Sequence, residues 1–171
     1  GVLSGPPKAD VNKTALEREI NLLLAATLNI EANAKIISTQ YAGEPFGRAV
    51  CQRFVYRRGE QASTVISGIE RSFLLSVAKM LYGDHVEDEM DLVLSTVEEF
   101  SAQFWITLSR QLTGNYEKID ILENHFLLAQ SLSDELRNLH PVVSILFTSD
   151  LGKFFISSDS ERMANICKIS A

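Results

Sequence analysis

The sequence predicts an α+β fold in which helices pack on an antiparallel sheet. Three observations predict it: apolar residues recur at helical spacing over two long stretches, a β-prone hairpin separates them, and further β-prone runs follow. The chain has 171 residues, of which 46% are hydrophobic, so one core can form. We expect one domain over residues 14–158, a linker or disordered terminus over 1–13, and a C-terminal tail over 159–171.

The first long helix is expected from Thr14 to about Ser38, because leucines and alanines recur there every three or four residues. Thr14 and Glu17 have the spacing of a capping box, which favours a helix start at this point. Glycine and proline then interrupt the chain. Residues 48–57 and 62–69 are rich in β-branched and aromatic side chains and flank a glycine, so they predict a hairpin.

A short helix is predicted over residues 72–82, with Gly83 as the residue that ends it. The second long helix is predicted over 88–112, where apolar side chains form a continuous stripe. The β-prone runs after it predict three more strands, over residues 119–129, 142–148 and 153–158.

Charge and composition narrow the choice of partners. The net charge of −6 disfavours binding to nucleic acid or to anionic lipid. The longest apolar run, residues 22–30, contains Thr27 and Asn29 and is too short for a membrane span. Without a signal-like apolar segment near residue 1, we expect a cytoplasmic protein in which Cys51 and Cys167 are reduced thiols.

Several clusters of charged or ligand-type residues have simple structural explanations. The carboxylates ahead of the second long helix lack the spacing of a calcium loop, and they can instead stabilise the helix N-terminus. These residues are Asp84, Glu87, Asp88, Glu89 and Asp91. The predicted hairpin carries four arginines, which can meet an acidic partner or guard a strand edge. They are Arg48, Arg53, Arg57 and Arg58.

The sequence predicts no metal or cofactor site of its own. The three histidines, His85, His125 and His140, are scattered and match no metal-ligand spacing. The chain also lacks the glycine-rich loops that hold nucleotide phosphates and the serine elbow of α/β-hydrolases.

Four polar residues interrupt the aromatic run in the middle of the second long helix: Glu98, Glu99, Ser101 and Gln103. Glu99 and Gln103 are four residues apart, so their side chains project side by side. A carboxamide there can orient an attacking water, and the acid can pair with a partner lysine, which suits hydrolysis of a phosphorylated carboxylate. Alternatively, these residues are the solvated face of an amphipathic helix.

Three segments carry a resemblance to a known family: residues 20–29, residues 65–83 (VISGIERSFLLSVAKMLYG) and residues 144–157. They resemble the N-terminal helix, a strand-to-helix unit and the closing hairpin of CheX-like domains in the CheC superfamily of bacterial chemotaxis phosphatases. The resemblance covers roughly residues 16–158. It implies a mixed sheet with two long helices across one face, a homodimer, and a response-regulator receiver domain as partner, with Mg²⁺ held by that receiver.

This family removes phosphate from a receiver aspartate with a Glu-x-x-Asn motif, which is degenerate here. If Glu99 occupies the Glu position, Ala102 stands where Asn is expected, and we expect Ala102→Asn to place an amide on the same face. If Glu98 occupies it, Ser101 stands there instead. Gln103 can replace the amide, since its spacing from Glu99 resembles that of the unrelated phosphatase CheZ. Two hypotheses follow: a non-catalytic or divergent interaction module in chemotaxis or two-component signalling, or an active aspartyl-phosphate phosphatase that uses Glu99 and Gln103.

Overall fold

The computed structural model describes residues 11–86, 90–114 and 116–168, and within them the chain forms five α-helices and one six-stranded sheet. The strands are β1 (Lys35–Ser38), β2 (Ala49–Arg58), β3 (Gln61–Glu70), β4 (Ile119–Leu127), β5 (Val143–Thr148) and β6 (Phe154–Ser158). The helices are α1 (Lys13–Leu28), α2 (Arg71–Tyr82), α3 (Met90–Thr113), α4 (Leu132–Leu139) and α5 (Glu161–Lys168), with short 3-10 turns at Asp84–Val86 and Ala129–Ser131.

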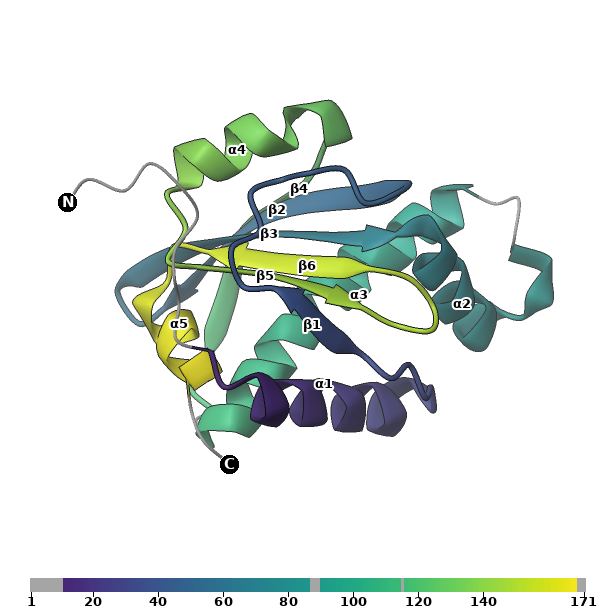
Figure 1. The fold of residues 1–171 in the computed structure, drawn as a ribbon, viewed down its shortest axis with the longest axis horizontal. Coiled ribbons are helices and arrows are strands. Elements are labelled where there is room, and N and C mark those ends of the chain that lie inside the picture. The colour runs from purple at the N-terminus through teal and green to yellow at the C-terminus, as the bar shows by residue number, and fades with distance from the viewer. Residues whose placement is uncertain (1–10, 87–89, 115, 169–171) are drawn as a thin grey trace.

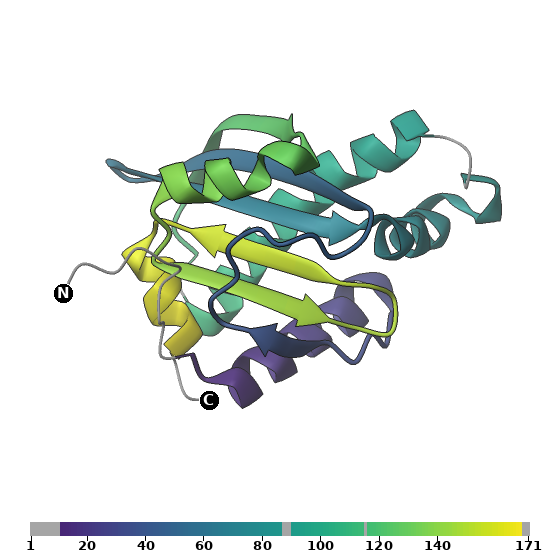
Figure 2. The same cartoon turned by 45° about the horizontal axis from the view of Figure 1, so that its top comes forward.

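The strands lie in the order β1-β5-β6-β3-β2-β4, and every pair is antiparallel. Helices α1 and α3 cross one face of the sheet, whereas α4 lies over the other (Figure 1). Figure 2 shows α4 in front of the sheet and the two long helices behind it. The predicted α+β class, with an antiparallel sheet and two long helices on one face, is therefore confirmed.

Hairpin β2–β3 forms as predicted. The strands pair from Arg58↔Gln61 to Ala49↔Glu70 without a register shift. The turn between them includes Gly59 at φ +61°, a conformation in which a side chain is strained. Because β3 lies between β2 and β6, most of it is buried. Residues of β3 and of α3 line the same small cavity, so the two elements face each other.

The main core lies between the sheet and α1, α2 and α3. Its centre is aromatic: the rings of Phe147 and Phe154 stack at 4.7 Å, and Trp105 of α3 lies 6.4 Å from Phe147. A smaller core under α4 contains Tyr41 and Phe155, whose ring centroids are 4.7 Å apart. The sheet is therefore buried on both faces, and α3 is held by large rigid rings.

The first helix is shorter than predicted. Helix α1 ends at Leu28, because Asn29 takes a left-handed conformation at φ 53° and closes the last turn. Residues 35–38 form edge strand β1 instead, paired with β5. The N-cap is Asn12, whose side chain accepts a hydrogen bond from Ala15 N, so the capping box predicted at Thr14 is wrong.

Two short helices were not predicted from the sequence. Helix α4 follows β4 and buries Leu132 and Leu136 against the smaller core. Helix α5 lies in the expected tail, yet it buries Met163 and Cys167 in the main core. The packed unit therefore includes α5. The predicted start of the second long helix, Asp88, lies outside the described residues, and α3 is described from Met90.

Candidate functional site

Helix α3 presents a ridge of exposed polar side chains to solvent. The ridge consists of residues four apart, which line up along a helix: Asp91, Ser95, Glu99 and Gln103. Glu99 and Gln103 are its last two members, beside the part of α3 that carries Phe104 and Trp105 into the core. An acid and a carboxamide therefore lie side by side, one helical turn apart, where a protein surface can reach both.

The other sequence candidates on α3 lie differently. Ser101 is 7% exposed and Ala102 is 3% exposed, so both face the sheet rather than solvent. The side chain of Glu98 lies outside the described residues. An asparagine at position 102 would point into the core, so the expectation that Ala102→Asn restores a surface amide is wrong. The helix register, set by Trp105 and its neighbours, is the physical reason.

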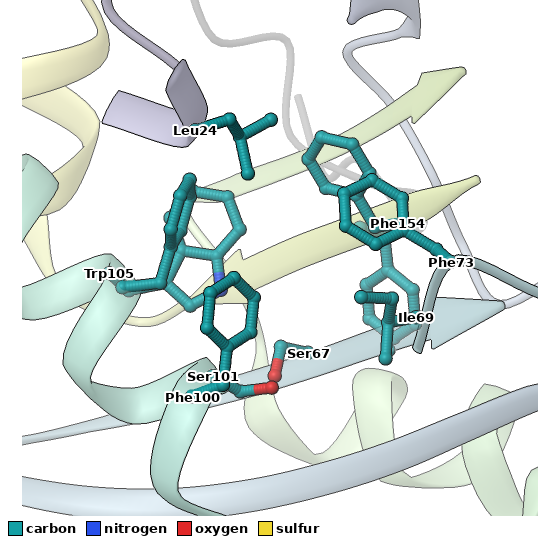
Figure 3. A pocket seen from close by; sticks show the side chains of 11 residues that line it. Leu24, Ser67, Ile69, Phe73, Phe100, Ser101, Trp105 and Phe154 are labelled. Carbon is teal, nitrogen blue, oxygen red and sulfur yellow. The ribbon is translucent and has the colours of Figure 1, made fainter. Parts of the chain in front are cut away.

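A small cavity lies behind α3, on the side away from Glu99 and Gln103. Its volume is about 30 Å³, and its lining is mostly aromatic and aliphatic (Figure 3). Ser67 and Ser101 contribute hydroxyls to it, and the Ser67 Oγ atom has no hydrogen-bond partner. The cavity is large enough for about two water molecules at roughly 10–15 Å³ each. It is too small for a phosphorylated substrate, so the candidate site is the exposed ridge.

The hairpin arginines do not guard a sheet edge, because β2 lies between β3 and β4. Arg53 and Arg57 instead reach across to acidic residues of β4, at 3.5 Å from Glu123 and 3.5 Å from Asp120 respectively. The fourth arginine of the set, Arg58, donates to Ser109 Oγ of α3 at 3.4 Å. The two pairs on β4 are partly exposed and contribute little stability.

The remaining candidates are the three histidines and the acidic set ahead of α3. His85, His125 and His140 are exposed, and among the described residues no three His, Cys, Asp or Glu side chains cluster to hold a metal. Three members of the acidic set, residues 87–89, lie outside the described part of the chain.

Both cysteines are free and buried. Burial raises the pKa of Cys51 to about 11 and that of Cys167 to about 12. The reactive thiolate is therefore scarce at neutral pH, and neither cysteine can serve as a nucleophile in the folded protein. Each thiol behaves as a small apolar side chain within its core.

A second acid–amide pair with the same spacing lies on α1, and sequence reasoning missed it. Glu17 Oε2 accepts a hydrogen bond from Ile36 N at 2.7 Å. Asn21 accepts from Ala34 N at 2.8 Å and donates to Ala34 O at 3.1 Å. These bonds fasten the segment leading into β1 against α1. We call Glu17 and Asn21 the α1 clamp; its polar groups are engaged within the fold.

The fold of this chain is similar to that of solved CheX and CheC-like proteins. No family model matches the sequence, and no curated protein matches it. The chain is 11% identical to chemotaxis protein CheX from Vibrio vulnificus, covering 85% of this chain and 93% of that chain with a TM-score of 0.56.

Two further structures have the same fold. A Borrelia burgdorferi CheX, solved as a CheX–CheY–BeF3–Mg²⁺ complex, is 15% identical and covers 86% of this chain and 97% of that one, with a TM-score of 0.55. Thermotoga maritima FliY is 13% identical, over 92% of this chain and 89% of that one, with a TM-score of 0.53. The resemblance inferred from the sequence is therefore confirmed as a likeness of fold. Among the residues that the structure describes, every helix is too short or too polar to cross a membrane.

Proposed function

We propose that this domain binds the receiver domain of a response regulator through the exposed ridge of α3, as a divergent, non-catalytic CheX-like module in bacterial chemotaxis or two-component signalling. One observation carries the proposal: Glu99 and Gln103 lie side by side and exposed on the long helix of this fold. The fold likeness to a CheX that was solved with CheY, BeF3 and Mg²⁺ supports the choice of partner.

The chemistry of the ridge fits this partner. The Glu99 carboxylate can pair with a cation at the edge of a receiver's phosphorylation site, and such a pair steers association and orients the two surfaces. The Gln103 amide can both donate and accept hydrogen bonds. Any Mg²⁺ would be held by the receiver, because the ridge offers only two described carboxylates, Asp91 and Glu99, two turns apart. A cytoplasmic location belongs to the same proposal.

The alternative function is that of an active aspartyl-phosphate phosphatase, and the exposed amide of Gln103 is the observation that favours it. In that mechanism Gln103 orients the water that attacks phosphorus, and Glu99 holds the receiver in place. Ser101 and Ala102 are buried, so neither can take the amide's role.

One set of variants distinguishes binding of the receiver from its dephosphorylation. Purified receiver domains loaded with BeF3 and Mg²⁺ are titrated with wild type, Glu99→Gln and Gln103→Ala. The matched control is Gln111→Ala, an exposed polar position on the same helix. We expect Glu99→Gln to weaken binding about tenfold, and the control to leave it unchanged, since loss of one interfacial charge pair costs a little over 1 kcal/mol. Equal binding by wild type and Glu99→Gln would contradict the proposal.

The phosphatase alternative is tested with the same proteins. It requires that wild type accelerates loss of phosphate from a phosphorylated receiver, and that Gln103→Ala lowers that rate by about 10²-fold or more. Binding without acceleration supports the interaction module. Acceleration that Gln103→Ala leaves unchanged would remove Gln103 from the mechanism.

The homodimer implied by the family resemblance is also proposed, with the free edge of β4 as the surface. Strand β4 lies at the end of the sheet, and its backbone groups on the outer side are unpaired by any other strand among the described residues. Ile121, Leu122 and Phe126 of this strand are exposed. An open strand edge that carries exposed apolar side chains favours pairing with another strand, and a second copy of β4 offers matching backbone groups.

A further inference from the structure

Three arginines from distant parts of the sequence meet where α3 ends. Arg58 is the last residue of β2, Arg110 is in the last turn of α3, and Arg162 is in the first turn of α5. Arg58 donates to Ser109 Oγ, next to Arg110 in the chain. Arg58 and Met163, the neighbour of Arg162, line the same cavity of about 10 Å³. We call these three side chains the arginine cluster.

Within the described part of the chain, few carboxylates balance this cluster. The groups whose charges act on Arg58 are two guanidiniums, those of Arg162 and Arg110, opposed by the phenol of Tyr56 and by one carboxylate, that of Glu117. Glu117 lies 3.8 Å from Arg162. The nearest further acid along β4, Asp120, is already shared by two other cations: Arg57 at 3.5 Å and Lys118 at 3.6 Å. Glu60 and Glu161 are the remaining neighbours in sequence, and both are exposed.

Burial makes this arrangement unfavourable in the free protein. The Nε atoms of Arg58 and Arg110 are both buried without a hydrogen-bond partner. Desolvation, and then the charges of Arg162 and Arg110, lower the pKa of Arg58 from its ordinary value. One arginine near the end of α3 would suffice to complement the helix dipole. Like charges with unsatisfied donors destabilise a fold unless an anion joins them.

We propose that the arginine cluster binds the phosphate group of a small molecule. Guanidiniums present planar forks of donors, and three of them in one neighbourhood suit the multiple charge and the several oxygens of a phosphate better than the single charge and two oxygens of a carboxylate. The site is independent of the receiver proposal. Arg110 lies seven positions after Gln103 on α3, which is about 10 Å along the helix, so a ligand here adjoins the ridge without covering it.

The test uses the full chain and three probes, namely inorganic phosphate, pyrophosphate and ADP, each compared with chloride at the same ionic strength. We expect at least one phosphate compound to raise the melting temperature of wild type above the chloride value, and to bind by calorimetry. Arg58→Gln, Arg110→Gln and Arg162→Gln should each weaken that affinity about tenfold or more. Arg137→Gln is the control, since Arg137 is exposed and pairs only locally with Asp134.

A second readout does not depend on the choice of probe. Without phosphate, Arg58→Gln should melt at or above the temperature of wild type, because it removes one of the crowded charges. Binding only to an acidic peptide, with no response to any phosphate compound at millimolar concentration, would overturn the proposal. So would phosphate binding that the three variants leave unchanged, or an Arg58→Gln protein that is clearly less stable than wild type.

Discussion

Replacing Ala102 by Asn tests which face of α3 points toward solvent. Ala102 is 3% exposed and belongs to the main core. A carboxamide there would be buried without a partner, at about 1–3 kcal/mol. It would also crowd the packing between α3 and the sheet, at about 1–3 kcal/mol, and replace the best helix former, at about 0.7 kcal/mol. We therefore expect Ala102→Asn to lower the free energy of unfolding by about 3–5 kcal/mol and to give no phosphatase activity.

Gln103→Asn is the matched control, because it introduces the same residue one position along at an exposed site. Its cost should stay within about 0.5 kcal/mol. The free energy of unfolding of both variants is measured by urea denaturation, followed by the fluorescence of Trp105, the single tryptophan. Equal slopes of this free energy against urea concentration confirm that the unfolded states are comparable. If Ala102→Asn is as stable as wild type and gains activity, then position 102 faces the partner and our placement of the ridge is wrong.

Three further predictions concern the clamp, the thiols and the sheet edge. Asn21→Ala should cost about 2–4 kcal/mol in urea denaturation, because it leaves the backbone N–H and C=O of the buried residue Ala34 unpaired; Asn138→Ala, at an exposed helical position of α4, should cost far less. Cys51 and Cys167 should resist a thiol reagent at pH 8 until the protein unfolds. Because their pKa values are raised from 9.0 to about 11 and 12, their contribution to stability is complete below pH 9 and is lost as pH rises through 11 and 12. Leu122→Lys on the β4 edge should shift a dimer toward monomer in sedimentation velocity.

Each of these has a clear contrary outcome. An Asn21→Ala protein as stable as Asn138→Ala would mean that the clamp bonds contribute nothing net. Rapid labelling of either cysteine in the native state would contradict its burial. A wild type that remains monomeric at high micromolar concentration would contradict the dimer itself.

The parts of the fold that were predictable from the sequence have local signals. Gly59 and Gly83 mark a turn and a helix end because the backbone there needs positive φ. The first helix was overextended because Ala34 was counted with the helical spacing of the leucines before it. In the structure Ile30, Ala32 and Ala34 alternate with exposed polar residues, as in an extended chain. The period of two between residues 29 and 36 was the signal that could have corrected the boundary.

Helices α4 and α5 could not be recognised from their own residues. Each has only eight residues, too few to be stable alone, and forms because its apolar side chains find a core built by other segments. The candidate site shows the same limit. The spacing of Glu99 and Gln103 predicted that they share a face, whereas the burial of Ser101 and Ala102 depends on how Trp105 seats α3 against Phe147. The arginine cluster has no signal in the sequence, since each member lies more than 50 positions from the next one along the chain.

The α1 clamp has a consequence for how the protein behaves at high concentration. Strand β1 is only four residues long, and it covers β5, an almost wholly buried apolar strand. Glu17 and Asn21 hold the segment that leads into β1, so releasing them would uncover the edge of β5 while the rest of the sheet stays intact. An uncovered apolar edge recruits strands from other molecules. We therefore expect the clamp to protect the protein against aggregation, and its loss to favour self-association from a nearly native state before global unfolding begins.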